Sequence, residues 1–266
     1  MNAKNGQVNT KNGQTDYIRF GRGRRTLVMI PGVGDGLKTV KGMAVPFALL
    51  YRRLTGHFTV FVFSRRNDLP EGITTRAMAD DLNDAMEALG LTDAVVVGVS
   101  QGGMIAQWLA VDHPDKVSRL VLTVTMARPN ETVREVLGSW IEMARQGDYQ
   151  GIMIDDASRS YSAKKRKRAL LTYRLMGNLG KPKDFSRFII QAESCLAHDA
   201  WDELGQIKCP TLVIGGSEDG IVTAEASAEL AGKIPGSRLK MYEGLSHGLY
   251  EEAPDFWDQV IAFTEE

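Results

Sequence analysis

Ser100 lies at the centre of the motif Gly98-Val99-Ser100-Gln101-Gly102, between an apolar run at 94–99 and a helical pattern at 104–111. A serine on a sharp strand-to-helix turn is presented as a nucleophile, because the tight backbone lifts its hydroxyl above the edge of the sheet. A side chain at Gly98 or Gly102 would collide with neighbouring backbone where the chain reverses. The motif is short, so its interpretation depends on the predicted strand before it and the predicted helix after it.

A serine hydroxyl needs a general base, and the chain has four histidines. His57 and His113 are interpreted as structural surface positions, and His198 as a packing or pocket residue. His247 lies in the loop 244–248, between a predicted strand at 237–242 and a predicted helix at 254–263. Loops that follow strands commonly carry catalytic groups, so we expect His247 to be the base.

An acid is expected between the serine and the histidine, at the carboxyl end of a strand. The segment 210–216 has the pattern of a buried strand and is followed by Ser217-Glu218-Asp219-Gly220. We expect Asp219 to orient His247, with Glu218 as the alternative, because the sequence does not say which carboxylate points inward. Acids are also common in solvated turns. The order serine, aspartate, histidine, each directly after a predicted strand, is more specific than any one motif.

These motifs resemble those of the α/β-hydrolase family over nearly the whole chain. The segment 27–34 resembles the strand and turn that donate a backbone N–H to the oxyanion hole, and 216–222 resembles the acid turn. The segment 244–254 resembles the histidine loop and the start of the final helix. Many relatives have His-Gly where this chain has Pro31-Gly32. The backbone N–H of the next residue, Val33, is present in either case, so the expected oxyanion donor is kept.

The resemblance implies a catalytic triad and an oxyanion hole. The triad residues are Ser100, Asp219 and His247, and the oxyanion donors are the backbone N–H groups of Val33 and Gln101. No cofactor or metal is expected: the chain has no P-loop motif, its two cysteines lack metal-ligand spacing, and Gly32–Gly36 does not complete a dinucleotide motif.

Strand and helix patterns alternate along the chain, which favours an α/β class with a doubly wound, mostly parallel sheet. Strand patterns occur at 15–20, 27–31, 58–63, 93–99, 118–124, 210–215 and 237–242. A helix is predicted at 74–89, with Thr75 as its cap.

Between 127 and 207 the patterning is helical. By resemblance this segment is a helical cap inserted after the sixth strand of the sheet, and 1–126 with 208–266 form the hydrolase core. Its aromatic and methionine side chains would line a pocket above Ser100 or, for most of them, form the small core of the cap itself.

Composition narrows the class of protein. The chain has 266 residues, with 32 basic and 33 acidic side chains, and this balance argues against nucleic-acid binding. Its 43% hydrophobic and 24% charged residues are typical of one globular domain. No apolar signal region and no run of 18 apolar residues occurs, and two cysteines without a disulfide framework fit a reducing compartment, so a cytoplasmic location without a membrane span is expected.

The predicted activity is hydrolysis of a small carboxylic ester or related acyl compound through an acyl-enzyme, with a small-molecule substrate. Alternatives on the same triad are a carbon–carbon bond hydrolase, an aminopeptidase or amidase, a lactonase, acyl transfer, and a receptor-like binder with negligible turnover. The sequence leaves open whether the chain is a monomer or a homodimer.

Three groups of charged residues bear on these alternatives. A carbon–carbon hydrolase would favour Arg65 or Arg66 as the group that binds a substrate carboxylate. An aminopeptidase would need a cap acid for the substrate ammonium, with Asp155, Asp156 and Glu193 as candidates. The basic run 164–168 is interpreted as a solvated helix face, with an anionic substrate or membrane surface as the alternative.

Overall fold

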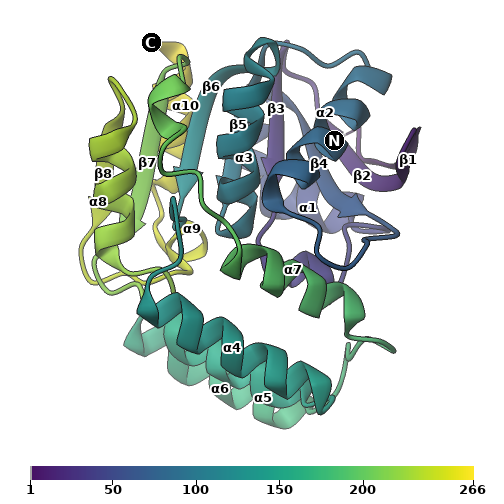
Figure 1. Cartoon of the computed structure of the whole chain (residues 1–266), viewed down its shortest axis with the longest axis vertical. Coiled ribbons are helices and arrows are strands. Elements are labelled where there is room, and N and C mark those ends of the chain that lie inside the picture. Colours follow the sequence, from purple (N-terminus) through teal and green to yellow (C-terminus); the bar gives the residue numbers. More distant parts are fainter. Residues whose placement is uncertain (1) are drawn as a thin grey trace.

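A computed structural model describes residues 2–266; Met1, the first residue of the expected core range, lies outside the described residues. Eight strands form one sheet in the order β1-β2-β4-β3-β5-β6-β7-β8 (Figure 1). Their bounds are β1 Lys4–Thr10, β2 Gly13–Gly21, β3 Arg25–Ile30, β4 Phe58–Arg66, β5 Ala94–Val99, β6 Val117–Thr123, β7 Thr211–Gly216 and β8 Arg238–Tyr242. Strands β1, β2 and β4 pair antiparallel, and all other neighbours pair in parallel.

The seven expected strands are present, and β1 is an eighth that the sequence pattern missed. It pairs with β2 as a hairpin at the sheet edge, and Gly13 takes a positive φ of 137° at the turn. Most of its side chains are exposed and polar, so β1 lacks the apolar alternation by which a strand is recognised. With β1 counted, six strands precede the long helical segment.

Helices cover both faces of the sheet because the central strands are buried on both sides, as parallel strands usually are. On one face α2 Thr75–Ala88, α3 Gln101–Asp112 and α8 Ala224–Lys233 share a core with the strands. On the other face α1 Ala44–Leu50, α9 Leu249–Glu252 and α10 Phe256–Glu265 pack against them. Because β3, β5, β6, β7 and β8 run parallel, their carboxyl ends lie at the same edge of the sheet.

The helix predicted at 74–89 forms as α2, but its cap is Thr74 and not Thr75. The Thr74 side chain accepts a hydrogen bond from the N–H of Ala77 (3.1 Å), as an N-cap residue does. The Thr75 hydroxyl instead contacts the Nδ1 of His198 (2.8 Å).

Four α-helices lie between β6 and β7. They are α4 Glu131–Arg145, α5 Tyr149–Ser160, α6 Ala163–Met176 and α7 Ser186–Leu196. Three of them form the bottom of the view in Figure 1, and α7 lies between these and the rest of the fold. An apolar cluster joins α4, α5 and α7 to residues that follow Ser100 and Asp219. Helix α6 contains no buried residue. Within residues 2–266, no helix has the length and apolar character needed to cross a membrane.

Candidate active site

Ser100 occupies the sharp turn between β5 and α3, with φ 54° and ψ −120°. A non-glycine residue rarely adopts a positive φ, and such strain persists only where surrounding contacts hold it. Here the N–H of Ser100 donates to the carbonyl of Thr123 (3.0 Å), and the Thr125 hydroxyl donates to the carbonyl of Ser100 (2.7 Å). The turn is therefore fixed by the neighbouring strand β6 and the loop that follows it.

Glycine is required around this turn by close backbone approach. A Cβ at Gly102 would overlap the carbonyl oxygen of Ile30 at the end of β3, and one at Gly98 would overlap the carbonyl of Gly102. A Cβ at Gly32 would lie 3.3 Å from the Cβ of Ser100. The loop after β3 thus lies directly beside the serine, and the collision expected for side chains at 98 and 102 is present in the geometry.

His247 follows β8 in a short loop and hydrogen-bonds to Asp219, which follows β7. The Nδ1 of His247 is 2.9 Å from the Oδ2 of Asp219 and 3.1 Å from its Oδ1. Asp219 and His247 are both buried, whereas Glu218 is exposed. Asp219 Oδ1 also accepts hydrogen bonds from the N–H groups of Ile221 (2.9 Å) and Val222 (3.0 Å). Of the two candidate acids, Asp219 is the one that contacts the histidine.

Asp219 and His247 each favour the charged form of the other. Burial by itself raises the pKa of Asp219, but the charge and hydrogen bond of His247, with the two backbone N–H groups, outweigh it and hold the pKa below its ordinary value. Burial by itself lowers the pKa of His247. The charge and hydrogen bond of Asp219, and to a smaller extent the charge of Asp156, raise it and leave the pKa above its ordinary value. An imidazolium at position 247 is therefore stabilised by Asp219.

The other histidines have structural contacts. His57 lies 3.7 Å from Glu265 and His113 lies 2.8 Å from Asp80, both near the surface. His198 is buried against Trp108, and burial lowers its pKa to about 4, so it stays neutral. It does not line the cavity described next, which leaves packing as its role.

A cavity of about 490 Å³ opens above Ser100. This volume is within the range of small-molecule sites. The cavity is lined by Ser100, His247 and the loop residues Gly32 and Val33, and its walls are mostly apolar. The helices between β6 and β7 contribute the wall residues Val133, Leu137, Trp140, Tyr149, Ile152, Met153 and Phe188. The other aromatic and methionine residues of this region do not line the cavity; they are Met143, Tyr161, Tyr173, Met176, Phe185 and Trp201.

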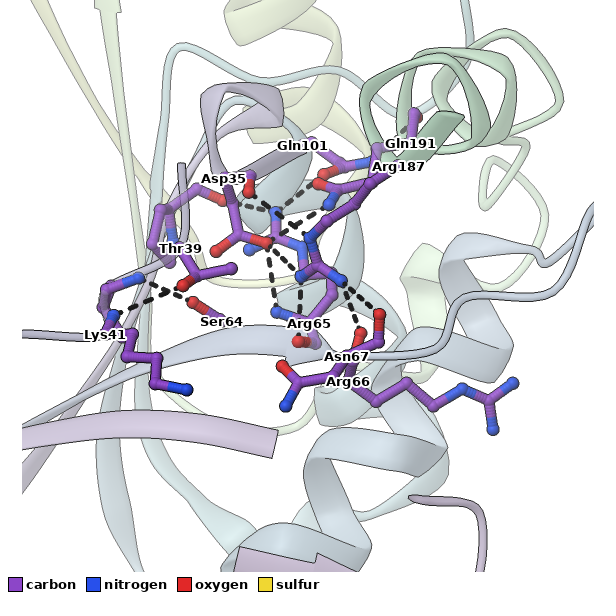
Figure 2. A network of polar contacts seen from close by, with 12 residues as sticks. Asp35, Thr39, Lys41, Ser64, Arg65, Arg66, Asn67, Gln101, Arg187 and Gln191 are labelled. Atoms are coloured by element: carbon purple, nitrogen blue, oxygen red, sulfur yellow. Dashed lines mark hydrogen bonds and ion pairs between the residues drawn. The ribbon is translucent and has the colours of Figure 1, made fainter. Parts of the chain in front are cut away.

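The first candidates for binding a charged group of the substrate are Arg65 and Arg66. Arg65 and Arg66 do not line the cavity: Arg65 is buried in a polar network beneath the loop after β3 (Figure 2), and Arg66 pairs with Asp81 at 3.3 Å. Both lie within β4, at its carboxyl end, whereas the sequence pattern placed them after a strand that ended at residue 63. That position did not decide which way their side chains point. Neither arginine is placed to bind a substrate carboxylate in this cavity.

Among the candidate cap acids, only Asp156 lines the cavity. Its Oδ1 accepts a hydrogen bond from the Ser160 hydroxyl (2.8 Å). Burial raises the pKa of Asp156, although Ser160 and His247 oppose that shift. Asp155 accepts from the indole N–H of Trp140 (2.7 Å), and Glu193 pairs with Arg145 at 3.3 Å. Asp156 is therefore the acid of this group that a substrate would meet.

The sequence analysis missed the polar contacts that join the loop after β3 to α7. Asp35 lines the cavity and binds Arg187 of α7 with Nη2–Oδ2 2.7 Å. Gln191 of α7 also donates to Asp35 (3.2 Å). The glycine-rich segment around Asp35 marks a turn, but nothing in the sequence signals that residues 152 and 156 positions later would bind it.

Comparison with known proteins agrees with this architecture. A family profile described as "alpha/beta hydrolase fold" matches residues 25–254. A protein named "Putative carbamate hydrolase RutD" from Caulobacter sp. (strain K31) is 27% identical over 250 residues, which cover 90% of this chain and 89% of that relative. The pimeloyl-[acyl-carrier protein] methyl ester esterase of Vibrio cholerae is also 27% identical, with 88% of this chain and 96% of the esterase covered.

Among solved structures, the enol-lactonase from Burkholderia xenovorans LB400 superposes with a TM-score of 0.81 at 24% identity, covering 98% of this chain and all of the lactonase. That likeness concerns the fold. The chain belongs to the α/β-hydrolase fold family, and its relatives named above are hydrolases that act on different bonds.

Proposed function

We propose that the chain is a serine hydrolase of a small carboxylic ester or related acyl compound, with Ser100, His247 and Asp219 as its triad. One observation carries this proposal: the strained serine and the buried histidine line the same small-molecule cavity, and the histidine is hydrogen-bonded to a buried aspartate. Helices α4–α7 are proposed to act as the cap, within 127–207, over a core of 1–126 and 208–266.

In the proposed mechanism, Ser100 Oγ attacks the substrate carbonyl carbon while His247 Nε2 takes the hydroxyl proton. Asp219 holds Nδ1–H and stabilises the imidazolium that forms. The backbone N–H groups of Val33 and Gln101 donate to the oxyanion. His247 then returns the proton to the leaving alcohol, and water, activated by the same histidine, releases the acid from the Ser100 acyl-enzyme.

The cavity walls favour a neutral acyl group over one that carries a carboxylate. The wall residues from α4, α5 and α7 are largely apolar. Among the described residues that line the cavity, Lys38 is the basic side chain besides His247, and it is exposed. A diketone acid would need a cationic partner, so this lining supports ester hydrolysis ahead of carbon–carbon hydrolysis.

Asp156 favours a second candidate, an acyl compound or peptide that carries an amine. The carboxylate lies on α5 and lines the same cavity as His247. A carboxylate binds an ammonium group through charge-assisted hydrogen bonds. An aminoacyl p-nitroanilide tests this candidate beside the esters.

The decisive experiment compares wild type with Ser100→Ala on p-nitrophenyl esters of increasing acyl length. We expect turnover that vanishes in Ser100→Ala and an optimum chain length set by the cavity. Ser118→Ala is the matched control, because that serine bonds to the Asp93 carbonyl (3.0 Å) and lies outside the cavity.

Labelling by a fluorophosphonate probe reports the nucleophile independently of the substrate chosen. Rapid labelling that needs Ser100 supports the proposal even if the esters are poor substrates. Labelling with a stable ligand complex and no turnover would favour the receptor-like alternative. Wild-type turnover that survives in Ser100→Ala would contradict the serine mechanism.

A further inference from the structure

Arg65, near the carboxyl end of β4, is buried beneath the two segments proposed to form the oxyanion hole. Its side chain is 5% exposed, and its Nη2 donates both to the carbonyl of Pro31 and to Oε1 of Gln101 (2.7 Å) (Figure 2). Pro31 is two residues before the proposed donor Val33, and Gln101 is the other proposed donor. One guanidinium nitrogen thus joins the loop after β3 to the residue that follows Ser100.

Gln101 is held from both ends of its side chain. While Oε1 accepts from Arg65, its Nε2 donates to the carbonyl of Gln191 (2.8 Å) and to the hydroxyl of Ser194 (3.0 Å) on α7. The side chain is fully buried. A buried amide with its donor and acceptor both satisfied has one preferred orientation, which restricts the backbone that carries it.

Asp35 ties Arg65 to α7 through a second set of bonds. Its Oδ2 accepts from the backbone N–H of Arg65 (3.2 Å) and from the guanidinium of Arg187 (2.7 Å). Arg187 also donates to the carbonyls of Arg65 (2.9 Å) and Arg66 (2.6 Å), as Figure 2 shows. The loop after β3, the end of β4 and the helix α7 are therefore one connected polar unit.

The charges in this unit do not balance. The unit holds two guanidinium groups and one carboxylate. The Asp35 carboxylate pairs with the guanidinium of Arg187 (2.7 Å) and bonds only to the backbone N–H of Arg65, so the charge of Arg65 has no ion pair within the unit. Burial lowers the pKa of Arg65 to about 10, although Asp35 opposes that shift, and the group stays protonated at neutral pH. Burying an incompletely paired charge destabilises a fold, whereas an unmatched positive charge below an oxyanion stabilises the transition state.

We propose that Arg65 is a positioning residue of the oxyanion hole. Its guanidinium holds the Pro31 carbonyl and the Gln101 side chain together, so that the N–H groups of Val33 and Gln101 converge on one oxygen. This inference rests on the proposed serine mechanism. Because the oxyanion exists only in the transition state and the tetrahedral intermediate, the loss of Arg65 lowers kcat and leaves KM nearly unchanged.

The test compares Arg65→Met and Arg65→Lys with Arg66→Met. Removal of a direct oxyanion donor costs about 10²- to 10³-fold in kcat, so a residue that acts through the loop is expected to cost about tenfold or more. A lysine ammonium has three donors and still reaches a carbonyl, so Arg65→Lys recovers part of kcat. Arg66→Met removes the neighbouring arginine, which pairs with Asp81 outside the network, and keeps wild-type kcat.

A double-mutant cycle with Gln101→Met separates positioning from a general loss of packing. If Arg65 acts through Gln101, the decrease in kcat for the double variant is smaller than the product of the two single decreases. Thermal unfolding of each variant shows whether it is folded at the assay temperature. If Arg65→Met does not fold, the proposal is tested by the kcat values of Arg65→Lys and Gln101→Met.

Two results would overturn the proposal. Wild-type kcat in Arg65→Met and Arg65→Lys excludes positioning, and a raised KM with unchanged kcat indicates a role in substrate binding instead. Either result, with turnover still abolished in Ser100→Ala, refutes the role of Arg65 and leaves the serine mechanism in place. Turnover that survives in Ser100→Ala refutes the serine mechanism itself.

Discussion

The loops at the carboxyl ends of β5, β7 and β8 and the helices between β6 and β7 border the same cavity, but they are built differently. The loops carry polar groups that backbone hydrogen bonds hold in place, such as Ser100 bonded to Thr123 and Asp219 bonded to Ile221. The helices contribute mainly apolar wall residues, and their outermost member, α6, buries none of its side chains. From this difference we propose that the sheet positions the chemistry, whereas the helices select the substrate.

The two regions meet at the histidine loop. The N–H of Gly248 donates to the carbonyl of Ser160 on α5 (2.6 Å), and the Ser246 hydroxyl donates to the carbonyl of Arg159. Asp156, on the same helix, raises the pKa of His247. Helix α5 therefore affects the proposed general base as well as the cavity wall.

The largest effect is expected on the sheet side, from Asp219→Asn. An asparagine keeps the size of the side chain but neither carries the negative charge nor favours the required imidazole tautomer, so kcat is expected to fall by about 10⁴-fold. The matched control is Glu218→Gln, which changes the exposed neighbouring acid. Steady-state kcat of both variants, measured on the best ester, checks the difference.

Equal losses in Asp219→Asn and Glu218→Gln would contradict the assignment of the acid. A large loss in Glu218→Gln alone would move the role of the acid to Glu218. Circular dichroism spectra of both variants show that a loss of activity is not a loss of fold.

An intermediate effect is expected on the helix side, from Ile152→Ala. Ile152 on α5 is buried and lines the cavity, so its truncation enlarges the acyl site. One methylene in an apolar pocket discriminates by about 10- to 200-fold, and the preferred p-nitrophenyl ester is therefore expected to become longer. The measurement is kcat/KM across the acyl series, with Ile152→Val as a milder variant.

Leu175→Ala is the control for this change, because Leu175 on α6 is 78% exposed and lies outside the cavity. Its acyl preference is expected to match wild type. If Ile152→Ala and Ile152→Val leave the preference unchanged while Leu175→Ala alters it, the helices do not select substrate in the way proposed.

The smallest effect is expected in the pH profile of Asp156→Asn. The proposed reaction needs neutral His247, so kcat/KM falls as pH decreases through the raised pKa of the histidine. Asp156 is one of the groups that raise this pKa, and its loss therefore moves the acid limb to lower pH. The profile of kcat/KM against pH measures the shift.

Asp155→Asn is the matched control, because Asp155 is adjacent on α5 but pairs with Arg159 at 2.8 Å. We expect the acid limb of its kcat/KM profile to lie at the same pH as that of wild type. An acid limb of Asp156→Asn that is unmoved, or moved to higher pH, would show that α5 does not influence the general base through this carboxylate.

The predicted sheet was largely correct because its strands are strongly apolar. Runs such as 94–99 and 211–216 are buried over every residue, and a run of that kind needs no further information to indicate a central strand. The polar strand β1 was missed because its pairing with β2, and not its own composition, makes it a strand. The cap of α2 was misplaced by one residue, since Thr74 and Thr75 both have hydroxyls suitable for an N-cap.

Order along the chain predicted which serine, acid and histidine to consider, but the direction of side chains required the fold. Asp219 and Glu218 are adjacent, yet one contacts His247 and the other is exposed. Arg65 and Arg66 are adjacent as well, and one enters the network with Asp35 and Arg187 while the other pairs with Asp81. Alternation along a strand sends neighbouring side chains to opposite faces, and the sequence does not state which face is which.

The sequence by itself determined the α/β class, the order of the candidate triad and the glycines that its turns require, because these depend on local backbone geometry and on apolar runs. Only the tertiary structure decided which helices border the cavity, which acid faces His247, and that a buried arginine lies under the proposed oxyanion loop. Those features depend on contacts between residues as far apart as Asp35 and Arg187. Such contacts form only when the sheet and the inserted helices pack together.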